Sequence, residues 1–341
     1  MKKVPLLLAI FLLLFAVVFI KNYSNNKKES INPVAQIENG QQDPLTISAM
    51  RAGVYPGSNL KIEETLEDGE NYHQYIASYL SDGLKIYGLL TIPIGNKPAG
   101  GWPVIIFNHG YIPPTQYRTT ERYTAYVDAF ARDSYIIFKP DYRGNGSSEG
   151  APEGSYYSPA YTVDVLNALA SVKKLPDVNP NKIGMWGHSL GGNITLRSLV
   201  ISPDIKAAVI WGGVVGTYDD LMNNWQRRAT YSTPPNELAL RNRSRADLIQ
   251  KYGTLQQNPK FWQSIDPNYN LQFVSAPVQL HAGLSDEEVP WQFSEGLKAR
   301  LGQAGKYSEF YTYSGADHNI SEPSFSLAMQ RSVNFFNKYL K

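Results

Sequence analysis

Short runs of β-branched and aromatic residues alternate with longer stretches of helical periodicity from residue 61 onward. The Asp82-Gly83 pair between the second and third runs is typical of a tight hairpin turn, so the sheet is expected to begin antiparallel. The later alternation indicates parallel strands joined by right-handed crossovers, with helices on both faces of the sheet. The predicted strands are 61–66, 72–79, 84–92, 104–107, 135–138, 182–186, 207–211, 278–281 and 307–313, and the predicted helices are 123–131, 161–172, 194–201, 291–301 and 325–340.

The segment from 218 to 270 interrupts this pattern. It separates two predicted strands by more residues than a simple crossover needs, and it is rich in aromatic residues and arginine. We interpret it as a small lid insertion. The rest of the chain is expected to form a single domain of the α/β class, mostly parallel, that covers residues 45–341.

The N-terminus has the pattern of a targeting segment. Lys2 and Lys3 precede an apolar run over 4–20, and a polar stretch follows up to residue 42. The run is long for a cleaved signal peptide and only just long enough to span a bilayer, and no small-residue cleavage site follows it. We therefore predict a signal anchor over 1–20 and a linker over 21–44, with an extracytoplasmic domain tethered to the cell membrane. Secretion after signal cleavage is the alternative.

Composition excludes several function classes. Lys and Arg total 32 against 30 Asp and Glu, so no basic excess is available to bind nucleic acid. The chain contains no cysteine, which excludes disulfides, Cys-ligated zinc and thiol nucleophiles. Composition leaves the oligomeric state open.

The strongest motif follows the predicted strand 182–186, where Gly187-His188-Ser189-Leu190-Gly191 leads into a predicted helix. A serine between two such glycines, on a turn from strand to helix, is typical of a nucleophile elbow. The glycines are expected because a Cβ at either position would collide with neighbouring backbone. Ser189 is the predicted nucleophile.

A serine hydroxyl needs a base to take its proton, and the chain has five histidines. With this elbow the order along the chain is serine, acid, histidine. His281 and His318 follow Ser189, and His281 precedes the best acid, so His318 is the predicted base.

Asp286 is the predicted acid, because it lies in the loop directly after the strand 278–281. A carboxylate there can accept the Nδ1 proton of the imidazole and hold its tautomer. Glu287, Glu288 and Asp317 are competing acids nearby, and the two glutamates are more typical of solvated surface groups.

Backbone N–H groups are expected to stabilise the developing oxyanion, one from Leu190 after the nucleophile and one from Tyr111 after the strand 104–107. The turn from Asp141 to Gly146 follows the next strand, and we expect it to contain an internal ion pair with Arg143. No step of this chemistry requires a cofactor or a metal.

Five motifs recur together in one family: the elbow, the His109-Gly110 turn, the Asp-Tyr-Arg-Gly-x-Gly turn, the Gly-x-x-Asp-x-x-Val-Pro stretch and the final Asp317-His318. Over roughly residues 72–340 the chain resembles the catalytic domain of the prolyl oligopeptidase family of serine peptidases, within the α/β-hydrolase fold. The resemblance implies a serine peptidase that acts on peptides through a Ser-His-Asp triad.

The elbow departs from the family pattern, which typically carries Tyr or Trp near the serine, and looks closer to esterase and lipase relatives. Family peptidases also commonly carry a large β-propeller, for which only the residues before 84 remain here. Hydrolysis of a small ester by a carboxylesterase or acyl esterase is therefore the alternative to peptide hydrolysis. A non-catalytic, membrane-tethered binding protein is the second alternative.

Overall fold

The computed structural model describes residues 43–341 apart from 155, 227–230 and 232. The predicted anchor and nearly all of the predicted linker lie outside the described residues, so these two boundaries stay predictions. The described residues belong to one compact unit, Gln42–Lys341. No helix among its described residues has both the length and the apolarity that crossing a bilayer requires.

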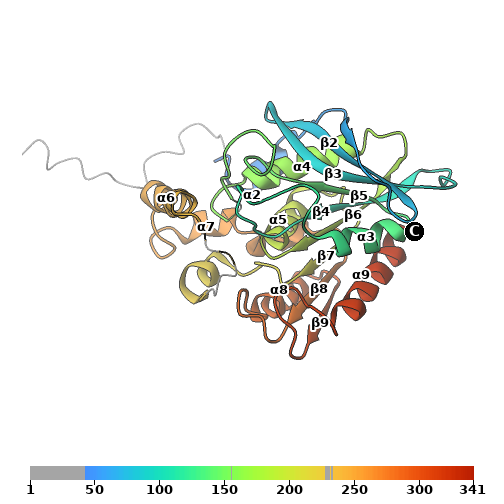
Figure 1. Ribbon diagram of the computed structural model, residues 1–341. Coiled ribbons are helices and arrows are strands. Elements are labelled where there is room, and N and C mark those ends of the chain that lie inside the picture. Colours follow the sequence, from blue (N-terminus) through green and yellow to red (C-terminus); the bar gives the residue numbers. More distant parts are fainter. Residues whose placement is uncertain (1–42, 155, 227–230, 232) are drawn as a thin grey trace, which may run out of the picture. The chain divides into compact units, whose positions relative to one another are not determined.

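In the described residues, nine strands form one sheet in the order β1-β2-β3-β5-β4-β6-β7-β8-β9 (Figure 1). The first three strands and the β3–β5 pair are antiparallel, and every other neighbouring pair is parallel. The expected mostly parallel sheet with an antiparallel start is confirmed. The strands are β1 (Lys61–Thr65), β2 (Tyr72–Ser81), β3 (Leu84–Pro93), β4 (Trp102–Asn108), β5 (Ile136–Pro140), β6 (Val178–His188), β7 (Ala207–Trp211), β8 (Val278–Gly283) and β9 (Ser308–Tyr313).

The predicted hairpin turn is present between β2 and β3. Ser81 pairs with Leu84, so the loop has two residues, and both take positive φ angles, 51° at Asp82 and 80° at Gly83. Such a turn matches the right-handed twist of the strands that it joins.

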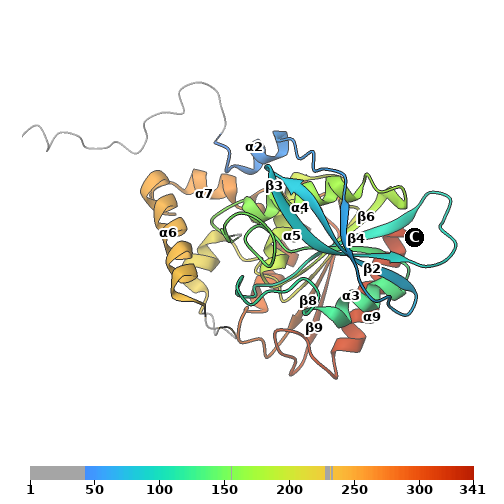
Figure 2. The same cartoon turned by 45° about the horizontal axis from the view of Figure 1, so that its top comes forward.

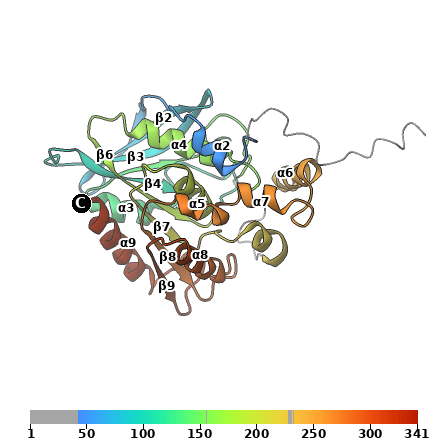
Figure 3. The ribbon, with the colours of Figure 1, turned by 180° about the vertical axis from the view of Figure 1, so that it is seen from behind.

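Helices cover both faces of the sheet, as expected. The main helices are α2 (Ile47–Ala52), α3 (Thr124–Arg132), α4 (Ala160–Val172), α5 (Leu190–Ile201), α8 (Gln292–Gln303) and α9 (Phe325–Leu340). Val104 and Ile106 of β4 pack in the core with α2, α4, α5 and α8, whereas Ile105 and Phe107 pack in a second core with α3 and α9. In Figures 2 and 3, α4 and α5 lie together, and α3 and α9 form a separate group. Because both faces are covered, β4, β5, β7 and β8 are buried along almost their whole length.

The insertion between β7 and β8 is helical. It contains η1 (Asp220–Asn224), α6 (Pro235–Tyr252), α7 (Pro259–Ile265), η2 (Pro267–Tyr269) and η3 (Leu271–Phe273). It has a small core of its own around Tyr218, Leu248, Trp262 and Ile265. Among the described side chains of α6, Leu248 is the one that is buried. The lid role of this insertion stays a prediction.

Helix α2 was not predicted from the sequence, because six residues are too few to show a periodicity. Thr46 caps it by accepting a hydrogen bond from the backbone N–H of Ala49 at 3.1 Å. Arg51 donates to the carbonyl of Val200 at 2.7 Å, near the end of α5, where helix carbonyls lack intrahelical partners. The described fold therefore begins just before α2.

Candidate active site

Ser189 lies at the sharp turn between β6 and α5, with φ 55° and ψ −120°. A non-glycine residue in this region carries strain of order 1–3 kcal/mol, which persists only where the surroundings hold it. Its N–H donates to Trp211 O at 3.1 Å, and its carbonyl accepts from Gly192 N at 2.9 Å and Val214 N at 3.0 Å. These three backbone bonds hold the strained conformation that presents the hydroxyl.

Both glycines of the elbow are sterically required, as expected. A Cβ on Gly187 would collide with the Thr195 hydroxyl and the Gly191 carbonyl, and one on Gly191 would collide with the carbonyl of Asn108. β4 and the start of α5 therefore approach more closely than any side chain permits.

His318 and Asp286 lie after neighbouring parallel strands, β9 and β8, whose ends meet where Gly283 pairs with Tyr313. The Nδ1 atom of His318 is 2.7 Å from Oδ2 of Asp286. Oδ1 of Asp286 accepts from the backbone N–H groups of Glu288 at 2.8 Å and Val289 at 2.9 Å. Both side chains are shielded, with exposed fractions of 9% for His318 and 1% for Asp286. A carboxylate can only accept, so Nδ1 of His318 donates and Nε2 is left to interact with a third group.

The structure separates Asp286 from the competing acids. Asp317 accepts from the backbone N–H and the hydroxyl of Ser321, both at 2.9 Å, and so closes its own turn. Glu287 is exposed, whereas Glu288 is partly buried and lines a pocket described below.

Of the other histidines, three lie outside that pocket. His73, in β2, pairs with Asp68 of the preceding loop. His281 is buried in β8 between the Tyr313 hydroxyl and Gln279. His109 is stacked between the rings of Tyr117 and Tyr142.

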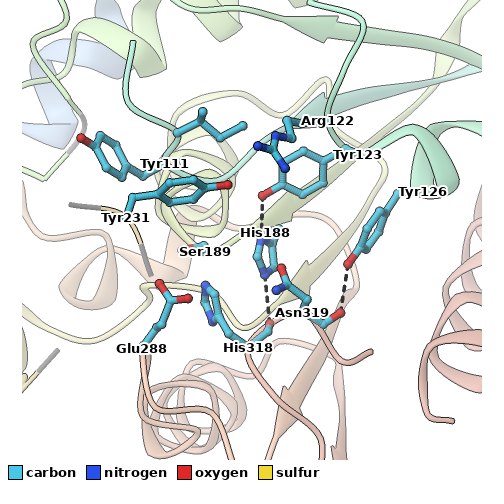
Figure 4. A pocket seen from close by; sticks show the side chains of 11 residues that line it. Tyr111, Arg122, Tyr123, Tyr126, His188, Ser189, Tyr231, Glu288, His318 and Asn319 are labelled. Carbon is cyan, nitrogen blue, oxygen red and sulfur yellow. Dashed lines mark hydrogen bonds between the residues drawn. The ribbon is translucent and has the colours of Figure 1, made fainter. Parts of the chain in front are cut away.

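A pocket of about 200 Å³ contains both Ser189 and His318. Figure 4 shows the two side chains beside the same hollow, which four tyrosines also line: Tyr111, Tyr123, Tyr126 and Tyr231. Arg122 and Glu288 add one charge of each sign. Tyr231 belongs to the insertion, so the insertion borders this pocket, although sequence reasoning assigned no residue of it to the site.

The predicted oxyanion donors are the backbone N–H groups of Leu190 and Tyr111, and their role stays a prediction. Leu190 is the first residue of α5, where backbone N–H groups lack partners within the helix. Tyr111 lines the pocket, whereas the N–H of the preceding Gly110 donates to the Tyr123 hydroxyl at 2.8 Å. The amide of Gly110 is therefore already used by Tyr123.

Sequence reasoning missed His188 and Tyr123 as parts of the site. Nδ1 of His188 is 2.7 Å from the Tyr123 hydroxyl, and Nε2 is 3.0 Å from the carbonyl oxygen of His318. Burial, together with the nearby His318, lowers the pKa of His188 from 6.5 to about 3, so its ring is neutral. The position of His188 inside the elbow was the available signal, whereas nothing in the local sequence marks Tyr123.

The expected ion pair inside the Asp141–Gly146 turn was wrong. Arg143 pairs with Asp164 of α4 at 2.7 Å and with Asp82 at 2.9 Å, both outside the turn. Asp141 instead accepts from the hydroxyl groups of Tyr117 and Thr119, and burial raises its pKa to about 6. The intervening Tyr142 has a φ of 62°, a left-handed turn that a sequence pattern does not specify.

The described residues contain no cluster of three or more His, Asp or Glu side chains that could hold a metal ion.

The fold and this site define a serine hydrolase of the α/β-hydrolase fold. Residues 122–341 match the model of the prolyl oligopeptidase family, and the chain belongs to that family. Among curated relatives, the uncharacterized peptidase YtmA of Bacillus subtilis is 26% identical over 245 residues, which cover 72% of this chain and 85% of YtmA.

Solved structures share the fold at lower identity. The acylaminoacyl peptidase of Pyrococcus horikoshii superposes with a TM-score of 0.62 at 21% identity, over 80% of this chain and 43% of the peptidase. An acetyl xylan esterase from Paenibacillus sp. R4 superposes with a TM-score of 0.62 at 18% identity, over 86% of this chain and 92% of the esterase. The chain thus spans about two fifths of the peptidase and nearly the whole esterase.

Proposed function

We propose that Ser189, His318 and Asp286 form a catalytic triad that hydrolyses peptides through an acyl-enzyme. The observation that carries the proposal is the 2.7 Å hydrogen bond from His318 to buried Asp286, with His318 and Ser189 in one pocket. Because this bond keeps the proton on Nδ1, Nε2 of the imidazole carries no proton and can accept the one from Ser189. Membership of a peptidase family and the intact site favour an enzyme over a non-catalytic, membrane-tethered binding protein.

The mechanism has two acyl transfers. Ser189 attacks the carbonyl carbon while Nε2 of His318 takes the hydroxyl proton, and the N–H groups of Tyr111 and Leu190 stabilise the oxyanion. The tetrahedral intermediate collapses, His318 gives the proton to the leaving group, and an acyl ester on Ser189 remains. Water, deprotonated by His318, then attacks this ester and releases the acid and the free serine.

The pocket supports a peptide substrate. Its tyrosines offer ring faces against which substrate side chains can pack, while Arg122 and Glu288 can attract groups of either charge. A peptide offers side chains and charged groups that can bind to these parts of the pocket, whereas a simple alkyl ester offers few such groups.

Ester hydrolysis is the second candidate. The pocket of about 200 Å³ is smaller than the roughly 300–1,000 Å³ of usual ligand sites. A short acyl group or a single side chain would fill it, and the same triad cleaves esters more readily than amides because the leaving group is better.

Replacement of the nucleophile tests the proposal. Ser189→Ala is expected to lower kcat by about 10⁴-fold or more and to abolish fluorophosphonate labelling. Ser326→Ala, an exposed serine at the start of α9, is the matched control and should behave as wild type. Near-normal turnover by Ser189→Ala would refute the triad. Comparing p-nitrophenyl esters with peptide p-nitroanilides then decides between the two substrate classes.

We further propose that the domain is extracytoplasmic and tethered by an N-terminal anchor, on the grounds of the lysines and apolar run at residues 2–20. A protein that begins at Asp43 is expected to be soluble and fully active on small substrates. Fractionation of the full chain and protease treatment of spheroplasts test this, and a membrane-bound domain that external protease cannot reach would contradict the orientation.

A further inference from the structure

Three hydrogen bonds connect the parts of the site through Tyr123 and His188. The N–H of Gly110 lies 2.8 Å from the Tyr123 hydroxyl, which lies 2.7 Å from Nδ1 of His188. Nε2 of His188 lies 3.0 Å from the carbonyl oxygen of His318. Figure 4 shows the two bonds made by the His188 ring as dashed lines beside Ser189.

The two end groups, the His318 carbonyl and the Gly110 N–H, determine the direction of all three hydrogen bonds. A carbonyl oxygen only accepts, so Nε2 of His188 carries the proton, and Nδ1 of the neutral ring is a bare acceptor. The Tyr123 hydroxyl therefore donates to Nδ1 and accepts from Gly110. The Gly110 N–H, the Tyr123 hydroxyl and the His188 ring can thus form these hydrogen bonds with only one placement of the protons.

Packing holds the two rings in place. The Tyr123 ring lies against Phe107 and Trp186, at centroid distances of 5.6 and 6.1 Å. The rings of His188 and His318 are 4.5 Å apart. His188 is nearly fully buried, and Tyr123 takes a left-handed conformation with φ 63° at the start of α3. Strain of this kind clusters at functional sites, where surrounding contacts maintain it.

A residue in the first turn of α3 also binds the carbonyl of Asn319, the residue after His318. The Tyr126 hydroxyl donates to the carbonyl of Asn319 at 2.9 Å. The rings of Tyr123 and Tyr126 lie next to each other, with their centroids 5.4 Å apart. Two consecutive carbonyls beside the predicted base are thus bound by side chains from other parts of the fold.

We propose that Tyr123 and His188 are positioning residues, which set the distance of His318 from Ser189 and align the oxyanion turn at Gly110 with both. The inference rests on the proposed triad. Neither residue exchanges a proton with the substrate. Each acts by fixing backbone: His188 fixes the carbonyl of the base, and Tyr123 fixes the amide that precedes Tyr111.

Loss of either residue is expected to affect turnover rather than substrate binding. A shift of about 1 Å between reacting groups can cost 10²-fold in rate, while substrate contacts elsewhere in the pocket persist. Loss of the His188 bond to His318 is therefore expected to lower kcat by about 10- to 100-fold, with KM changed by less than about threefold.

Three substitutions at His188 separate its hydrogen bond to His318 from its hydrogen bond to Tyr123. His188→Gln can place an amide N–H where Nε2 was, and so keeps a donor for the His318 carbonyl. His188→Asn reaches only the Nδ1 position, and so keeps a partner for Tyr123 alone. His188→Leu keeps neither.

We expect kcat within about fivefold of wild type for Gln and the 10- to 100-fold loss for both Asn and Leu. Melting temperatures measured on all three provide the comparison. If kcat follows the melting temperature instead, or if Gln is as impaired as Leu, the positioning role is wrong.

Tyr123→Phe tests the role of Tyr123, since it removes the acceptor of the Gly110 amide. Tyr135→Phe is the matched control, because its hydroxyl donates to Asn337 at 2.8 Å away from the site. The rate of fluorophosphonate labelling of Ser189 should fall about 10-fold in Tyr123→Phe and stay unchanged in Tyr135→Phe. Equal rates in both would overturn the role of Tyr123.

The Ser189→Ala variant separates a failure of the proposed triad from a failure of the positioning role. If it retains activity, the triad itself is wrong. If it is inactive while His188→Leu has wild-type kcat, only the positioning role fails.

Discussion

Replacing Asp286 by asparagine would change one atom of the predicted acid and little of its surroundings. The remaining oxygen of the new side chain can still accept the two backbone N–H groups, of Glu288 and Val289, that Oδ1 accepts now. The new NH₂ group then occupies the place of Oδ2, which is 2.7 Å from Nδ1 of His318. The loop should therefore keep its shape in Asp286→Asn.

The chemistry should not survive this change. Two donors cannot share a hydrogen bond, so His318 is expected to move its proton from Nδ1 to Nε2. An Nε2 that already carries a proton cannot accept another from Ser189. The same exchange in a serine-protease triad lowers kcat by about 10⁴-fold. At about 1.4 kcal/mol per factor of ten, this corresponds to about 5.5 kcal/mol of lost transition-state stabilisation.

The assay is kcat on a saturating p-nitrophenyl ester, measured together with the rate of fluorophosphonate labelling. Glu287→Gln, in which an exposed acid next to Asp286 loses its charge, is the matched control and should stay near wild type. A kcat above one-tenth of wild type for Asp286→Asn, with the fold intact, would show that another group orients His318.

Three further changes test the packing around the site. Arg143→Met leaves the carboxylate of Asp164 buried without its cation and should destabilise the fold by about 3–5 kcal/mol in urea unfolding, whereas Lys97→Met, at an exposed pair, should cost less than about 1 kcal/mol. An equal cost for the two would contradict the buried pair. Burial lowers the pKa of His281 from 6.5 to about 3. The contribution of the neutral ring to folding stability is therefore present above pH 6.5 and is lost as pH falls towards 3. His281→Gln should reduce the acid slope of stability by about 1.4 kcal/mol per pH unit between these values, and an unchanged slope would show that His281 binds a proton in the folded state. Gly191→Ala should destabilise by at least about 1–3 kcal/mol and abolish activity, and a stable, active protein would mean that the elbow can open.

Much of the fold was predictable because its signals are local. The Asp82-Gly83 turn, the alternation of apolar runs and helical stretches, and the two elbow glycines each act within a few residues. The predicted elements accordingly fall on the observed ones, with differences of a few residues at their ends. Helix α2 and the helices of the insertion were not predicted, since their stability comes from contacts such as Arg51 with Val200 and from the small core around Trp262.

The partner of Arg143 shows the limit of local reasoning. Asp141 is two residues away in the chain, whereas Asp164, its actual partner, is 21 residues away on α4. Spacing along the chain favoured the near acid. The left-handed turn at Tyr142 and the approach of α4 decide for the distant one.

The sequence by itself determined the order of strands and helices and the order of the predicted nucleophile, acid and base, because turn chemistry and periodicity act between neighbours. Only the tertiary structure decided which groups meet. His188 and His318 are 130 positions apart, and Tyr123 and His188 are 65 apart. No pattern of nearby residues encodes bonds between such distant positions. Parallel strands that end at one edge of the sheet bring them within hydrogen-bonding distance, and a hydrogen bond depends on that distance rather than on separation along the chain.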